Sequence, residues 1–433
     1  MPGYRHSILT SESFAAALDR SNPLARFRRR FYTPPGTIYL DGNSLGLLSR
    51  PAERSLARVL EEWRTMGVRG WIEGPRPWFY EAEETGAAAA PLVGARTHEL
   101  VFTGTTTVNI HALVATFYER RGRRTRILAD ALDFPTDIYA LRSQIALKGG
   151  DPEADLVLVP SRDGRTIEEE DIIERMTPEV ALVFLPSVLF RSGQLLDMER
   201  LTREAHLREI PIGFDCSHSA GAVPHRLNRW GVDFAVFCGY KYLNGGPGCS
   251  AFLYLHENRF DRKPVLAGWF GNKKTSQFDL RLDFDPTPAA GGWQISSPGI
   301  LGSATMPGSL TVLREAGIDR IRRESVRMTS YLIDLVKAVL EAPPYGFRIG
   351  TPLDPRRRGG HVALEHPREA LRINEALKAR GVVPDFRPPN VIRLAPIPLY
   401  NTYRQIRGVV FRLKDIVDSG EFRAFSRRRK AVS

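Results

Sequence analysis

The stretch "VDFAVFCGYKYLNGGPG", residues 232–248, decides how the rest of the chain is interpreted. Its first half is an apolar run of the kind found in strands that are buried on both faces of a parallel sheet. Its second half is rich in glycine, and Lys241 stands between the two halves. An ammonium group beside a buried strand costs free energy unless it is paired or has lost its charge. Lys241 is therefore the first candidate for a functional residue.

The segments upstream of this stretch predict an α/β fold. From about residue 97, short apolar runs alternate with amphipathic segments, which indicates crossover units, a mostly parallel central sheet and helices on both faces. We expect strands over 99–104, 126–130, 155–160, 180–186, 210–215 and 232–238. We expect helices over 105–121, 137–148, 168–176 and 198–209.

The pattern changes after about residue 305, where a long amphipathic region leads into a smaller α+β domain with a final helix from Thr402. We expect residues 51–310 to form the large domain and 311–420 the small one. The N-terminal 1–50 are predicted to join the small domain or to span both. Residues 421–433 are predicted to form a disordered basic tail.

Composition limits the class of protein. No apolar run reaches the roughly 18 residues that span a bilayer, so we expect no membrane segment. The net charge of +12 comes largely from scattered arginine clusters without interleaved aromatic residues, which argues against nucleic-acid binding. Three cysteines without a CxxC spacing predict a reducing, cytoplasmic location and no metal site.

Three strand ends carry candidate chemistry, because ligands of open α/β sheets bind beyond the carboxyl ends of the strands. "VFTGTTTVN" (101–109) offers free amides and hydroxyls to a phosphate, or is an ordinary helix N-cap. Asp215 is a partner for a protonated ring nitrogen, a helix N-cap or half of a metal pair. Lys241 is a nucleophile for an imine, or a strand-end lysine that extends to solvent.

Together these three features point to pyridoxal phosphate (PLP). The cofactor needs a phosphate site, an acid for its ring nitrogen and a lysine for its aldehyde. Phe134, which follows the strand expected over 126–130, is an aromatic residue that can stack on the pyridine ring.

With these residues in view, the chain resembles the kynureninase family of PLP enzymes, and in particular its bacterial type. The resemblance covers nearly the whole length and includes the segments "YLDGNSLGLL", "FPTDIYALRSQ", "WGVDFAVFCGYKYLN" and "RLAPIPLYN". It implies the fold-type-I architecture, a homodimer and hydrolysis of L-kynurenine to anthranilate and L-alanine in tryptophan catabolism. The alternatives are a related enzyme that acts on 3-hydroxykynurenine or another γ-keto amino acid, a cysteine desulfurase, or a cofactor-free binding protein.

The resemblance also assigns residues. It makes Lys241 the Schiff-base lysine, Asp215 the partner of the ring nitrogen and Tyr240 a candidate proton relay. Further cofactor contacts are expected from Thr106, Thr107, Phe134, Asp137, His218, Trp269 and Ser297. Substrate contacts are expected from Arg393, which matches the arginine that binds the α-carboxylate, and from Trp71, Asn43 and Ser44. Trp71 stands where animal-type members have a histidine, which favours kynurenine over 3-hydroxykynurenine.

Overall fold

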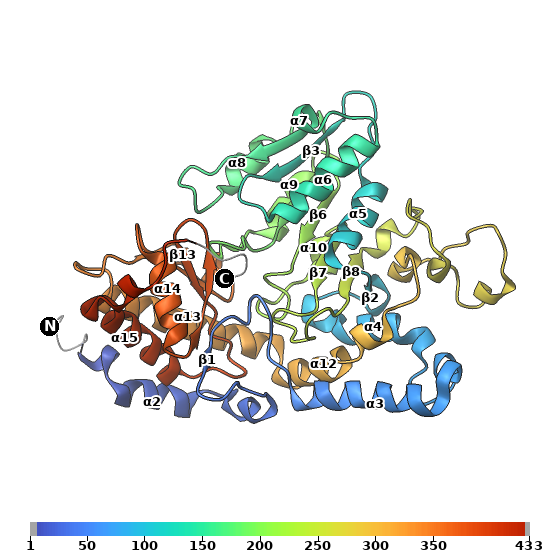
Figure 1. Cartoon of the computed structure of the whole chain (residues 1–433). Coiled ribbons are helices and arrows are strands. Elements are labelled where there is room, and N and C mark those ends of the chain that lie inside the picture. The colour runs from blue at the N-terminus through green and yellow to red at the C-terminus, as the bar shows by residue number, and fades with distance from the viewer. Residues whose placement is uncertain (1–6, 429–433) are drawn as a thin grey trace.

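The chain folds into two lobes built on separate sheets, as the computed structural model of residues 7–428 shows (Figure 1). The larger lobe has a seven-stranded sheet in the order β2-β8-β7-β6-β5-β3-β4. Strands β7, β6, β5, β3 and β4 are parallel neighbours, whereas β8 runs antiparallel to both β7 and β2. The strands are β2 (Leu100–Thr103), β3 (Arg126–Asp130), β4 (Leu156–Val159), β5 (Val180–Pro186), β6 (Ile212–Asp215), β7 (Phe234–Cys238) and β8 (Ala251–Leu255).

Helices cover both faces of this sheet, because successive side chains of a strand point to opposite faces. In β7, Phe234 and Val236 belong to one hydrophobic core and Ala235 and Phe237 to another. The first face is covered by α5 (Thr106–Phe117) and α6 (Pro135–Leu147). The second is covered by α4 (Glu81–Val93), α8 (Glu169–Glu174), α9 (Met198–His206) and α12 (Met306–Ala316). The predicted α/β class with a mostly parallel sheet is confirmed.

The smaller lobe has a four-stranded antiparallel sheet in the order β12-β13-β10-β9. Its last helix begins where the sequence predicts, since Thr402 and Gln405 form a capping box at its start. The strands are β9 (Arg348–Ile349), β10 (Val362–Glu365), β12 (Asp385–Arg387) and β13 (Val391–Leu394). The helices packed in its core are α13 (Ile318–Val339), α14 (Ala370–Ala379) and α15 (Tyr403–Ser419).

The N-terminal segment contributes to both lobes. α2 (Glu12–Ser21) places Ala15 in the core of the small lobe, whereas Leu24 and Phe27 lie in the core of the large one. β1 (Ile38–Tyr39) pairs in parallel with β11 (Val382–Val383). The core of the large lobe also continues past residue 310, to Ile321 in α13, so this helix joins the two lobes.

Two details differ from the sequence-based expectation. β8 was not predicted, although it lies between β7 and β2. The tail expected to be disordered from residue 421 begins with a 3-10 helix, Glu421–Ala424, and Phe422 and Phe425 pack on the small-lobe core. The expectation is therefore wrong for residues 421–428, and residues 429–433 lie outside the described part of the chain.

The remaining helices are short except for one. α3 (Arg50–Met66) runs along the large lobe (Figure 1). The others include α7 (Pro152–Asp155), α10 (Leu227–Trp230), α11 (Ile300–Ser303) and several 3-10 helices, among them one at Gly67–Trp71. Within residues 7–428, no helix is both long enough and apolar enough to span a bilayer.

Candidate active site

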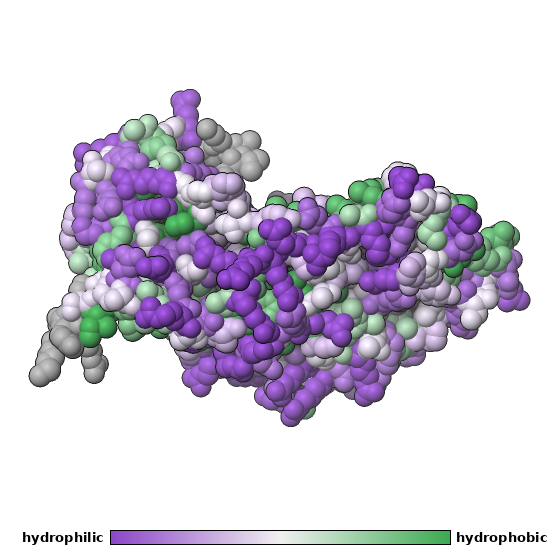
Figure 2. Space-filling view, turned by 90° about the horizontal axis from the view of Figure 1, so that it is seen from below, coloured by the Kyte–Doolittle hydropathy of each residue, from purple (hydrophilic) through white to green (hydrophobic). Residues whose placement is uncertain are grey.

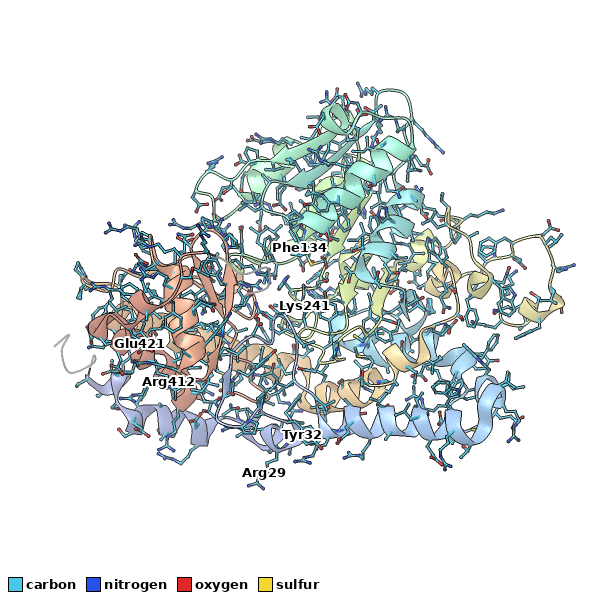
Figure 3. All side chains as sticks on the ribbon, in the orientation of Figure 1. Arg29, Tyr32, Phe134, Lys241, Arg412 and Glu421 are labelled. Carbon is cyan, nitrogen blue, oxygen red and sulfur yellow. The ribbon has the colours of Figure 1, made fainter. Side chains whose placement is uncertain are left out.

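Lys241 lies between the two lobes, in the loop that follows β7 (Figure 3). This loop is tied to the N-terminal segment, because the amide of Gly46 donates to the carbonyl oxygen of Tyr240 at 2.7 Å. Position 46 has no room for a side chain. A Cβ there would stand 2.5 Å from the carbonyl oxygen of Lys241 and 2.3 Å from Asn244 Oδ1. The "DGNSLG" segment, residues 41–46, therefore packs directly against the lysine loop.

The side chain of Lys241 is paired with a histidine. Its Nζ donates to Nε2 of His218 at 3.0 Å. Burial lowers the pKa of His218 well below its usual value, and the nearby charge of Lys241 lowers it further. The imidazole is therefore neutral at pH 7 and accepts this hydrogen bond. The sequence-based prediction that these two residues belong to one site agrees with this contact.

Asp215 ends β6, the strand next to β7, where it pairs with Val236. Its Oδ1 accepts a hydrogen bond from the amide of Ser217 at 2.7 Å, which closes a turn. Residues 216–222 contain no helix, so the N-cap alternative for Asp215 is wrong. Asp215 and Lys241 thus stand beyond the ends of adjacent strands, where the sheet topology places ligands.

Phe134 supplies an aromatic surface beside the lysine. The centroid of its ring lies 6.0 Å from Lys241 Nζ, and its edge packs against Phe190. Since 40% of Phe134 is exposed, one face of the ring is free to stack on a flat ligand.

Carboxyl groups are crowded beside Asp215. Asp137, in the first turn of α6, is 1% exposed, and neither of its carboxylate oxygens has a hydrogen-bond partner among the described residues. Burial raises its pKa well above the usual value, and the charge of Asp215 raises it further. Burial also raises the pKa of Asp133 strongly and that of Asp130 to about 7. The sequence reasoning named only Asp137 of these three.

The start of α5 has a cavity of about 370 Å³ beside it. Thr105 is the N-cap residue, and its hydroxyl accepts a hydrogen bond from the amide of Val108 at 3.5 Å. Thr105 lines the cavity together with Ser250 and Ser297, whereas Thr106 and Thr107 are the first two residues of the helix. The amides of a helix N-terminus suit a phosphate. The predicted pair Thr106 and Thr107 is therefore adjacent to the cavity but not among the residues that line it.

These residues fit pyridoxal phosphate. A lysine, an acid, an open aromatic ring and a helix N-terminus lie around one region of the strand ends. Several polar atoms there are buried without a hydrogen-bond partner in the described structure: both oxygens of Asp137, Nδ1 of His218, and both amide atoms of Asn43, which is 0% exposed. Buried polar groups are almost always paired, so this unpaired set is what a polar ligand would satisfy.

Arg393 is held more tightly than the sequence suggests. It is 0% exposed and its guanidinium forms an ion pair with Asp385, its neighbour across β12 and β13. It also donates to the carbonyl oxygen of Phe190 at 2.6 Å and to Ser44 Oγ at 3.1 Å. The sequence analysis missed Asp385. Asp385 could have been predicted as the partner of Arg393 if residues 385–393 had been recognised as a hairpin, because residues opposite each other in a hairpin are in contact.

Trp71, Trp269 and Ser297 line a different pocket. It is apolar, has a volume of about 460 Å³ and is completed by Val68, Arg69, Ile72, Phe79, Phe270 and Phe278. The segment around residues 265–285, yellow in Figure 1, projects from the end of the large lobe away from the small lobe, whereas Lys241 lies between the lobes (Figure 3). One chain therefore does not bring Trp71 and Trp269 to Lys241.

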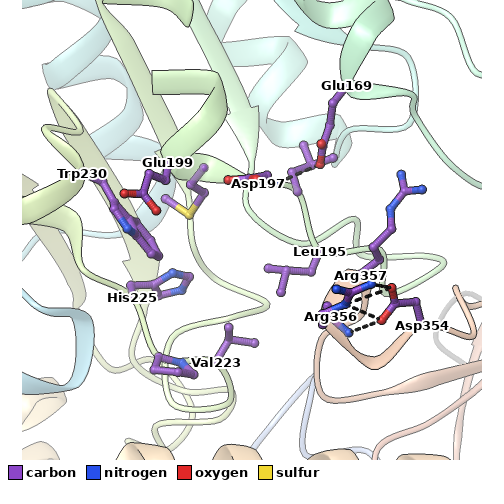
Figure 4. Close-up of a pocket in the computed structure, with 13 residues that line it drawn as sticks. Glu169, Leu195, Asp197, Glu199, Val223, His225, Trp230, Asp354, Arg356 and Arg357 are labelled. Atoms are coloured by element: carbon purple, nitrogen blue, oxygen red, sulfur yellow. Dashed lines mark hydrogen bonds and ion pairs between the residues drawn. The ribbon is translucent and has the colours of Figure 1, made fainter. Parts of the chain in front are cut away.

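A second cleft of about 460 Å³ contains none of the predicted site residues (Figure 4). It lies between α9 and the loop around Asp354 and has His225 and Trp230 on one wall. Arg356 in this cleft is already paired with Asp354 at 2.8 Å. The cleft is separate from the site around Lys241.

Comparisons with known proteins agree with this geometry. Residues 38–358 match the sequence model of the aminotransferase class-V family, and residues 321–413 match that of the kynureninase C-terminal domain. Kynureninase of Geobacillus thermodenitrificans (strain NG80-2) is 53% identical over 420 residues, which are 97% of each chain. Kynureninase of Bacillus anthracis is 51% identical over 430 residues, which are 99% of this chain and 100% of the relative.

Solved structures with a similar fold include PLP enzymes. A cysteine desulfurase from Thermococcus onnurineus NA1 superposes with a TM-score of 0.74 at 17% identity, covering 93% of this chain and 98% of its own. A C-DES mutant with glycine covalently linked to the PLP cofactor has a TM-score of 0.76 at 16% identity, covering 90% and 99%. The predicted fold-type-I architecture is confirmed.

Proposed function

The chain belongs to the kynureninase family, and from this premise we infer that it hydrolyses L-kynurenine to anthranilate and L-alanine with pyridoxal phosphate as its cofactor. The observation that carries the proposal is the contact of Lys241 with neutral His218, 3.0 Å apart, beside Asp215 and the open ring of Phe134. The reaction consumes one water and breaks the Cβ–Cγ bond of the substrate.

Each residue of the site has its own role in the proposed reaction. When bound, the cofactor supplies an electron sink for the substrate's α-carbon. Lys241 holds the cofactor and afterwards takes the proton from the α-carbon, while His218 fixes the position of Nζ through their hydrogen bond. Asp215 keeps the pyridine nitrogen protonated by charge attraction. Arg393 and Ser44 bind the substrate carboxylate.

Tyr240 is the proposed proton donor for the substrate's β-carbon. Burial raises the pKa of its phenol, and neighbouring Cys238 raises it further, so the hydroxyl stays protonated at neutral pH. The water that adds to the γ-carbonyl provides the second carboxylate oxygen of anthranilate. The proton from Tyr240 then completes the methyl group of alanine. The proton that the water loses returns to Tyr240, so that one water is consumed in all.

We also propose that the working form is a homodimer. Many of the large exposed apolar residues belong to the face that carries Trp71 and Trp269, and a soluble monomer rarely exposes so large an apolar patch. This apolar face consists of the exposed residues of two pockets that share Trp71, namely Val68, Ile72, Trp269 and Phe278 in one and Trp63 and Leu301 in the other. Figure 2 keeps the left and right of Figure 1, and some apolar residues appear there at the right-hand end of a mainly hydrophilic surface. A second copy docked there would bring Trp71 and Trp269 to the lysine of its partner.

A charge on the apolar face tests the dimer. Val68 is 80% exposed, so Val68→Glu leaves the fold of one chain intact but buries a carboxylate in the proposed interface. We expect the dimer to weaken by about 100-fold or more and the activity to fall with it, as light scattering and kinetics at several protein concentrations would measure. Leu207→Glu is the matched control, because Leu207 is 72% exposed at the end of α9 and lines neither pocket of the apolar face. A fully active monomeric wild type would contradict the proposal.

Substrate preference follows from the apolar wall. Trp71 offers no dedicated partner to a ring hydroxyl, so we expect kcat/KM for kynurenine to exceed that for 3-hydroxykynurenine by about 10-fold. The two substrates are tested in parallel through the fluorescence of their aromatic products. Trp71→His is expected to shift the ratio toward 3-hydroxykynurenine, and an unchanged ratio would remove Trp71 from the aryl pocket.

The cysteine desulfurase alternative is disfavoured, although one of the similar structures described above is a cysteine desulfurase. A desulfurase needs a reactive cysteine on an accessible loop. Cys249, the one cysteine in the loop after Lys241, is buried, and its burial raises the pKa of the thiol to about 12. Cys216 has the same shift for the same reason.

We propose a cytoplasmic location and a role in tryptophan catabolism, the pathway in which kynurenine arises. Cys216, Cys238 and Cys249 are all free, as expected for a protein of a reducing compartment.

A further inference from the structure

His361 is a buried imidazole that the proposed mechanism does not use. It is 0% exposed, and neither ring nitrogen has a hydrogen bond of good geometry among the described residues, although the backbone of Arg191 is close enough to raise the pKa of the ring. A buried ring that lacks well-formed hydrogen bonds has given up its bonds to water without full replacement. An imidazole in this state is suited to a polar group that arrives with the ligand.

The register of the small-lobe sheet places His361 next to Arg393. In the antiparallel pair β10 and β13, Ala363 lies opposite Arg393, so their side chains are on the same face. His361 precedes Ala363 by two residues and shares this face, because side chains alternate along a strand. Histidine and arginine therefore point together toward the large lobe.

On the other side, His361 faces the lysine site. Its ring lies edge-on to the ring of His218, with the centroids 5.9 Å apart, and His218 in turn contacts Lys241. Gly193 closes the remaining side at a φ of 77°, and a Cβ at that position would stand only 3.2 Å from His361 Nε2. The imidazole thus stands between the two charged groups that bracket an amino-acid substrate.

The ion pair of Arg393 explains why another donor is needed. Asp385, which also pairs with Arg387, already occupies part of the donor set of Arg393. The backbone oxygen of Phe190 and the hydroxyl of Ser44 take further donors. A substrate carboxylate therefore needs a second donor nearby. Burial and the Arg393 charge lower the pKa of His361 well below its usual value, against a smaller opposing effect of the Arg191 backbone. The ring is therefore neutral, and one of its two nitrogens carries a proton that it can donate.

We propose that His361 is a substrate-binding residue that donates a hydrogen bond to the α-carboxylate of the amino-acid substrate, beside Arg393. The inference rests on the proposed function only for the identity of the substrate. The chemistry recognised is that of any α-amino acid carboxylate held near Lys241.

The test compares His361→Leu, which removes the donor at similar volume, with His361→Gln, which restores one donor. We expect His361→Leu to raise KM for kynurenine by about 10-fold or more with kcat changed less than about 3-fold, and His361→Gln to recover most of the loss. Calorimetric binding of L-alanine to the holoenzyme is expected to weaken in parallel. Decarboxylated kynurenine, which has no carboxylate, should be processed equally by the variants and the wild type.

Different results would contradict the role of His361 and the proposed function. Equal losses on kynurenine and its decarboxylated analogue, or no rescue by glutamine, would overturn the role of His361. If the wild type did not cleave kynurenine at all, the proposed function would fail, but weaker L-alanine binding by His361→Leu alone would still support the carboxylate role. Melting curves and the absorbance of the bound cofactor show whether each variant is folded and has bound the cofactor. If His361→Leu does not fold, the test rests on the comparison of His361→Gln with the wild type.

Discussion

Replacing Lys241 with alanine is expected to lower kcat for kynurenine by at least about 10⁴-fold. The change removes both the group that holds the cofactor and the base for the α-proton. His218, whose Nε2 lies 3.0 Å from the lost amine, cannot replace it, because both nitrogens of an imidazole belong to the ring and cannot form the imine. The absorbance of the lysine-bound cofactor should vanish as well. The measurements are the steady-state rate of anthranilate release and the visible spectrum.

Lys148→Ala is the matched control for this experiment. Lys148 is also partly buried, and its Nζ donates to the carbonyl oxygen of Ala115 at 2.7 Å, but it lies on α6 away from the site. We expect Lys148→Ala to reduce stability by about 1 kcal/mol and to retain activity. If Lys241→Ala still formed a borohydride-reducible adduct at the normal rate, Lys241 would not be the residue that holds the cofactor.

Replacing Arg393 is expected to affect stability and substrate binding by separate routes. In Arg393→Gln, the buried carboxylate of Asp385 loses one of its two arginine partners and keeps Arg387 at 3.0 Å, so we expect a loss of about 1–3 kcal/mol of unfolding free energy. KM for kynurenine should also rise by about 100-fold, because a charge-assisted contact with the carboxylate is lost. Decarboxylated kynurenine should be little affected per folded molecule.

The double variant Arg393→Gln with Asp385→Asn separates the two effects. It has no carboxylate at position 385, and Arg387, which also loses its partner there, is partly exposed, so thermal unfolding should return close to that of the wild type. KM for kynurenine should stay high, because the carboxylate still lacks its arginine. A double variant with normal KM would show that Arg393 only supports the fold, and equal losses on both substrates in the single variant would exclude a carboxylate role.

Local patterns were sufficient for much of the architecture. The strands over β3, β5 and β7 were predicted because apolar runs of β-branched and aromatic residues are buried on both faces. β8 was missed, although "AFLYL" (251–255) is as apolar, because it follows a loop interpreted only for its glycines. The tail beyond residue 421 was misjudged because its arginines outweighed Phe422 and Phe425 in the interpretation.

The proximity of Lys241 and Asp215 could be predicted from the sequence alone, because each stands at the end of a buried strand and parallel strands bring their carboxyl ends to one edge of the sheet. Only the tertiary structure revealed that Arg393 is paired with Asp385, that His361 stands beside His218, and that Trp71 and Trp269 lie apart from Lys241. Those facts depend on the register between strands and on contacts between segments far apart in the chain. The periodicity of apolar residues along one segment contains no information about strand register or about contacts with distant segments.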